Sequence, residues 1–122
     1  MKSTQGKVLA AYTTIVRIGR KPMESKAAYK LFKLKKAMQD SVDFQAEQEE
    51  KFVTELGGEI SAEGRIVFKD ADKGAEYNGK RKALAEMECE IGIDKPLFNV
   101  RELPEISIAE LETLDDFIEV KE

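Results

Sequence analysis

The sequence predicts a mainly helical α+β fold: a long antiparallel helical hairpin with a β-hairpin at its tip, plus short helices near both ends. Residues Ser25 to Leu56 contain no glycine or proline and are rich in helix formers. Gly57 and Gly58 end that stretch, and two short β-prone runs follow. A second long helical stretch begins after Asp70. Two long helices joined by a short connection run antiparallel.

The composition indicates a single domain over residues 1–122 that folds without a metal or a disulfide. Hydrophobic residues make up 42% of the chain, which is enough for a core at this length. The single cysteine, Cys89, cannot form an internal disulfide, which suits a reducing cytosol. No apolar run approaches the ~20 residues needed to span a membrane.

Residues 4–18 are expected to form the first helix. Their apolar positions recur at helical spacing, although the β-branched run over residues 13–16 would also suit a strand. We favour the helix because the apolar positions fall on one face and Gly19 is a suitable terminator.

The long helix over Ser25–Leu56 is about 45 Å long at the usual rise per residue. Its seam is predicted to follow alternating three- and four-residue steps. Gln45 and Glu49 occupy the same seam, so the middle of the helix is expected to project beyond the core or to meet polar partners. The apolar seam positions are Ala28, Leu31, Met38, Val42, Phe52 and Leu56.

The β-prone runs over residues 59–61 and 65–68 flank a glycine-containing turn, which predicts a small β-hairpin. A lone two-stranded ribbon is only marginally stable. We therefore expect the hairpin to lean on the helix ends through Ile60, Ile66 and Phe68.

Asp70 is a suitable N-cap for a second long helix over residues 71–91. Gly74 and Gly79 weaken the first half of this helix by up to about 1 kcal/mol each. The dipeptide Asn78-Gly79 is also a turn signal, so a break at that point stays open.

The C-terminal part begins with an extended stretch over residues 96–100. Ser107 and Glu110 then have the spacing of a capping box, which predicts a short helix. A tail follows, and we expect it to pack with the N-terminal helix against the open end of the helical hairpin. It docks through three apolar residues, Phe117, Ile118 and Val120.

Charges are sorted along the chain. Residues 1–38 hold ten of the twenty Lys and Arg residues but only one of the 24 acids. The rest of the chain is strongly acidic, and the formal net charge is −4. Such a distribution lets the basic part attract the acidic part, either within one molecule or in a second copy of an isologous dimer.

The missing residue types argue against enzymatic activity. There is no histidine, which removes the common general base near neutral pH and most zinc sites. No phosphate-cradling glycine motif occurs, and the paired aspartates are explained by helix capping or by a solvated tail. Cys89 is predicted to lie on a helix between two glutamates, which raise the pKa of a thiol. We expect no catalytic residue, no cofactor and no metal site.

The basic stretch over residues 26–36 is the main candidate for function, because Tyr29 and Phe32 alternate with its lysines. Three interpretations are open: a solvated or internally paired face, a surface for a protein partner, and a phosphate- and base-contacting surface for nucleic acid. The candidate interaction surface comprises Lys26, Lys30, Lys33, Lys36, Gln45 and Glu49.

Several segments together resemble a family of small, uncharacterised proteins encoded near tail and lysis genes in phages and prophages of Gram-positive bacteria. The resemblance is carried by the short first helix ending before Pro22, the segment 25–36, the hairpin with residues 67–70 leading into the second helix, and the ending 106–118. It implies a setting in a bacterial host, in the cytoplasm or associated with the virion, and no activity.

Together these observations predict a non-enzymatic interaction or assembly protein of phage origin. Its expected partner is a phage or host protein, or a second copy in a homo-oligomer, and no membrane is involved. The alternative is a nucleic-acid-binding regulator that uses the basic helix over residues 26–36.

Overall fold

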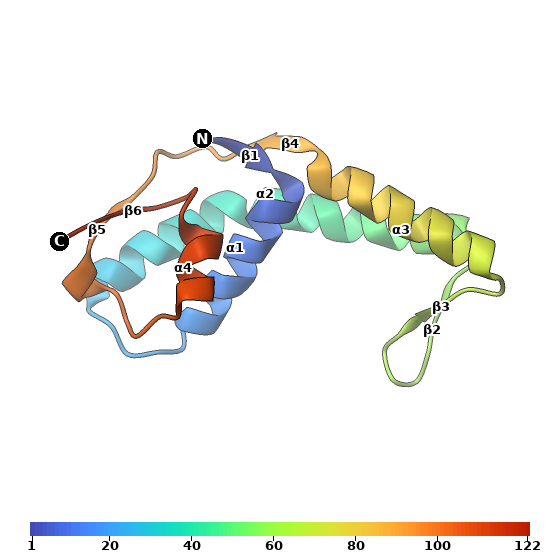
Figure 1. Ribbon diagram of the computed structural model, residues 1–122, viewed down its shortest axis with the longest axis horizontal. Helices are drawn as coiled ribbons and strands as arrows, with labels where there is room; N and C mark the ends of the chain where they lie inside the picture. Colours follow the sequence, from blue (N-terminus) through green and yellow to red (C-terminus); the bar gives the residue numbers. More distant parts are fainter.

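The computed structural model describes residues 1–122 and shows a mainly helical α+β protein, which confirms the predicted class (Figure 1). A short 3₁₀ helix spans Val100–Glu102. The four α-helices are α1 (Gln5–Ile18), α2 (Ser25–Glu55), α3 (Ala71–Glu86) and α4 (Ile108–Leu114).

Six short strands form three separate two-stranded sheets. Two pairs are antiparallel, β1 (Lys2–Thr4) with β4 (Glu88–Glu90) and β2 (Glu59–Ile60) with β3 (Ile66–Val67). The third pair is parallel and joins β5 (Leu97–Asn99) to β6 (Glu119–Lys121). Each sheet therefore joins two short segments locally and does not form a layer of the fold.

The molecule consists of a body and an arm (Figure 1). The body contains α1, α4, the β5–β6 pair and the first half of α2. The arm contains the second half of α2 and α3, which lie side by side, with the β2–β3 hairpin beyond their far ends. One helix, α2, thus belongs to both parts.

The first helix, α1, is helical where the sequence also allowed a strand. Thr4 is its N-cap and accepts a hydrogen bond from the backbone N–H of Lys7 at 3.4 Å. Its apolar face is buried at Val8, Ala11 and Ile15. The strand β1 ahead of it was not predicted.

The buried seam of α2 differs from the predicted one. Ala27, Leu31, Leu34 and Met38 are buried, whereas the predicted seam residue Ala28 is exposed. The buried positions follow steps of four, three and four residues, so they lie on one narrow stripe against α1. The prediction placed the start of the seam one residue too late.

The core lies in the body, where thirteen buried apolar side chains form one cluster. Two aromatic rings, those of Phe98 and Phe117, are at most 1% exposed and join the β5 and tail segments to the helices. The arm has far less buried surface, since its buried apolar residues are Leu56, Tyr77 and Leu84. Apolar burial therefore stabilises the body more than the arm.

The β2–β3 hairpin forms, but its packing contacts with the helices of the arm differ from those predicted. Ile60 is 71% exposed and so does not pack on the helix ends, while Ile66 is 39% exposed. The two residues are paired across the ribbon. Only Phe68 makes the expected contact, with its ring 5.1 Å from that of Tyr77.

The helix α3 begins as predicted and ends early. Asp70 caps it by accepting a hydrogen bond from the Lys73 N–H at 2.9 Å, and the helix runs through Gly79 without a break. It stops at Glu86, however, and not at residue 91. The reason is the pairing of β4 with β1, which also places Cys89 on a strand and not on a helix.

The capping box of α4 is confirmed. The Ser107 N–H donates to Glu110 Oε1 at 3.0 Å, and the Glu110 N–H donates to Ser107 Oγ at 3.1 Å. Phe117 and Ile118 are buried as expected, while Val120 lies on β6 and is 42% exposed.

Phe98→Ala is expected to lower the free energy of unfolding by about 3–5 kcal/mol, because it leaves a cavity in the centre of the body. Val100→Ala, two residues away at a half-exposed position, is the control and is expected to cost under about 1 kcal/mol. Urea denaturation measures both. Equal losses in the two variants would contradict this account of the core.

Candidate functional site

The structure divides the six predicted interaction residues into two groups. Lys26, Lys33 and Lys36 are exposed, whereas the other three are engaged inside the molecule. The engaged residues are Lys30, Gln45 and Glu49.

Lys30 is a link between α2 and the segment after β5. Its Nζ lies 3.0 Å from Glu102 Oε2 and 2.6 Å from the Leu97 carbonyl oxygen. It also lies 5.1 Å from the centre of the Phe98 ring. The hydrogen bond from Lys30 and that from the Asn99 N–H hold the pKa of Glu102 below its usual value. The Lys30 side chain is therefore engaged in contacts that stabilise the fold.

Gln45 does not belong to an interaction surface, so that prediction is wrong. The residue is 4% exposed, and its Nε2 donates to the backbone carbonyl oxygen of Gln5 and lies 3.1 Å from Gln5 Oε1. Glu49 accepts from Arg81 Nε at 3.3 Å and so connects α2 with α3. The polar stretch of the seam does meet polar partners, but they come from α1 and α3 of the same chain.

The opposite side of α2 is uncovered over most of its length, and we call it the α2 face. It carries three exposed aromatic rings, with Tyr29 60%, Phe32 57% and Phe44 37% exposed. Its residues recur at three- and four-residue spacing, so they lie on one side of the helix. The charged members between residues 26 and 50, all exposed, are Lys26, Lys33, Lys36, Asp40, Asp43, Glu47 and Glu50.

None of these seven charged side chains takes part in an ion pair within the molecule, although eight ion pairs form elsewhere. The sequence analysis identified the lysines but missed the four acids. The helical spacing of these acids was visible in the sequence. They were missed because the side of α2 that faces solvent depends on how α1 and α3 pack against it.

The aromatic and basic groups of the α2 face lie together. The Tyr29 and Phe32 rings are stacked with centroids 6.4 Å apart, and Lys33 Nζ lies 5.6 Å from the centre of the Tyr29 ring. Flat apolar rings beside ammonium groups can contact an acidic protein surface or stack on bases. The α2 face is the candidate site for this reason.

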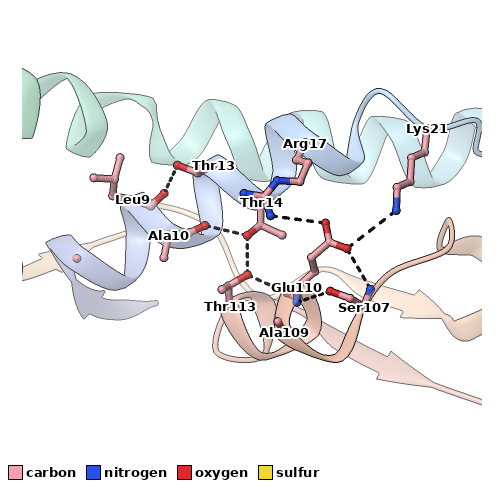
Figure 2. A pocket seen from close by; sticks show the side chains of 11 residues that line it. Leu9, Ala10, Thr13, Thr14, Arg17, Lys21, Ser107, Ala109, Glu110 and Thr113 are labelled. Atoms are coloured by element: carbon pink, nitrogen blue, oxygen red, sulfur yellow. Dashed lines mark hydrogen bonds and ion pairs between the residues drawn. The ribbon is translucent and has the colours of Figure 1, made fainter. Parts of the chain in front are cut away.

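A second surface feature is a groove between α1 and α4, with a volume of about 780 Å³ (Figure 2). Glu110 projects across it toward Arg17 and Lys21, at 3.9 and 4.0 Å. Thr113 Oγ1 lies 2.7 Å from Thr14 Oγ1. Because these polar groups face one another, we interpret the groove as the contact between the two helices and not as a ligand site.

Ion pairs confirm that the basic N-terminal part of the chain attracts the acidic C-terminal part within one molecule. Lys7 lies 3.4 Å from Asp116, Lys30 reaches Glu102, and Glu110 faces two cations of the α1 end. Hydrogen bonds from Ser107 lower the pKa of Glu110, and the nearby Lys21 and Arg17 contribute in the same direction.

The structure shows no group of three or more Cys, Asp or Glu side chains that could hold a metal ion. Burial raises the pKa of the Cys89 thiol. No helix combines the length and the apolar character that crossing a membrane requires.

Glu110→Gln is expected to lower the melting temperature at neutral pH. Because the folded-state pKa of Glu110 lies below its usual value of 4.5, its stabilising effect is complete above that pH and is lost as the pH falls through the lower value. The difference between wild type and variant should therefore shrink in acid. The exposed Glu112→Gln is the control, and a difference that grows in acid would contradict the assignment.

Lys30→Ala is expected to lower the melting temperature more than Lys33→Ala does. Both variants lose one positive charge, but only the first leaves the Glu102 carboxylate without its partner. Differential scanning calorimetry provides the comparison. Equal melting temperatures would show that the Lys30 contacts do not support the fold.

No protein-family model, no curated protein and no solved structure matches this chain.

Proposed function

We propose that this chain is a non-enzymatic interaction or assembly protein of phage or prophage origin, and that the α2 face is its contact surface. One observation carries the proposal. Seven charged side chains and three exposed aromatic rings lie along one helical face, and none of these charges forms an ion pair within the molecule. Exposed aromatic residues beside unpaired charges are typical of interaction surfaces.

The non-enzymatic part of the proposal rests on the sequence, which contains no histidine and a single cysteine. In the α1–α4 groove, Glu110 faces Arg17 and Lys21, and Thr113 bonds to Thr14, so these polar groups are engaged with one another. The phage setting rests on the resemblance of several segments to small phage proteins. The proposed partner is a phage or host protein or a second copy of this chain.

Immobilised wild-type protein is expected to retain a partner from the lysate of a bacterium that carries prophages. K33E/K36E, which reverses two charges of the α2 face, is expected to lose that partner. K69E/K82E is the matched control, since it makes the same charge change at exposed positions away from the face. Mass spectrometry compares the three samples, and identical retained proteins in all three would contradict the proposal.

Nucleic-acid binding is the second candidate, because the stacked Tyr29 and Phe32 rings lie beside Lys33 on an exposed surface. Three lysines contacting single-stranded phosphates would give a slope of about −2 for the logarithm of affinity against that of salt. Fluorescence anisotropy with a labelled oligonucleotide tests this. No binding at low salt would eliminate it. The four acids that continue the face disfavour a phosphate partner, so we prefer a protein.

A further inference from the structure

The α2 face has complementary charges at its two ends, and we propose that it binds the same face of a second copy in an antiparallel dimer. This inference rests on the proposed function, because it names the partner of the same surface. Between residues 26 and 50 the charged side chains of the face are basic at Lys26, Lys33 and Lys36 and acidic at Asp40, Asp43, Glu47 and Glu50, and the exposed Lys51 follows at the end of this stretch. Within this stretch the sign changes once, across the three residues between Lys36 and Asp40.

A two-fold axis near residue 38 makes this charge order self-complementary. It places the basic half of each α2 against the acidic half of its partner. Lys33 and Lys36 of one copy then lie near Asp43 and Asp40 of the other, and Lys26 lies near Glu47 and Glu50. A parallel alignment would instead set like charges against each other. The antiparallel arrangement is the isologous geometry that two-fold dimers use.

The exposed rings give such a dimer an apolar contribution. Tyr29 and Phe32 lie in the basic half and Phe44 lies in the acidic half, so each half of the interface would contain rings from both copies. Aromatic residues are enriched in the buried centres of protein interfaces. The rings are largely exposed in the single molecule, which leaves their surface available for burial.

Charge complementarity favours a second copy over other occupants. An acidic protein or a nucleic acid would neutralise only Lys26, Lys33 and Lys36, and it would be repelled by the four acids beyond them. A basic partner would meet the opposite problem. The same face of a second chain satisfies both halves at once.

The geometry also predicts a weak dimer. The stretch from Lys26 to Glu50 is about 36 Å long and one helix wide, which is below the size of a standard stable interface. We expect a dissociation constant on the order of micromolar that rises with salt, because exposed charges are screened.

Sedimentation equilibrium of the full chain tests the proposal. Wild type is expected to dimerise at about 50 mM salt and to dissociate near 500 mM. K33E/K36E and D40K/D43K should each associate at least roughly tenfold more weakly, because each brings like charges together at the axis. An equimolar mixture of the two variants should associate one to one. K69E/K82E is the control and should behave as wild type.

Disulfide trapping tests the orientation in a C89S background. A mixture of K26C and E47C chains should form a disulfide between two chains under mild oxidation, while neither variant alone should do so. In a parallel dimer each variant alone would form the disulfide, because identical positions would be adjacent. Circular dichroism verifies that every variant keeps its helix content.

The outcomes separate this inference from the proposed function. The dimer proposal is overturned by a wild type that stays monomeric at low salt, by reversal variants that still dimerise, or by a mixture that does not associate. If K33E/K36E nevertheless loses a protein retained from lysate, the α2 face still binds a partner and the proposed function stands. If the face variant changes neither measurement, both proposals fail.

Discussion

The length of α2 is the constraint on which the rest of the structure depends. Its 31 residues extend about 46 Å, farther than the core of the body can cover. Its seam is therefore buried twice, first by α1 in the body and then by α3 in the arm. Gln45 lies at the point along α2 where the contacts with α1 end and those with α3 begin. Its hydrogen bonds to Gln5 explain how a polar residue is tolerated there. The opposite side of the helix is left to solvent.

Charged residues fall into two groups that serve different purposes. Those of the first group pair across long sequence separations, as Lys30 does with Glu102 and Arg17 with Glu110, and they join the C-terminal segments to the helices. Ion pairs near the surface stabilise a fold only modestly, so the buried apolar cluster must supply most of the stability. The second group is the α2 face, whose charges form no ion pair within the molecule. The proposed contact with a partner is our explanation for that group.

Local features were predictable from the sequence, and contacts between distant segments were not. The caps at Asp70 and at Ser107 depend on neighbours three residues away, and both were found. The early end of α3 depends on pairing between residues 88–90 and 2–4, which no local pattern reveals. For the candidate site too, the local pattern was predictable and the contacts with distant segments were not. The lysines and their aromatic neighbours were visible, but the engagement of Lys30 and Gln45 required knowing which segments pack against α2.

Lysine reactivity tests most directly whether one side of α2 packs within the molecule while the opposite side is exposed and binds a partner. The acetylation rates of Lys30, Lys33 and Lys36 can be read by mass spectrometry in dilute and in concentrated protein. Lys30 is expected to react slowly at both concentrations, while Lys33 and Lys36 are expected to react fast in dilute protein and more slowly in concentrated protein. Equal rates for all three lysines, unchanged by concentration, would contradict it.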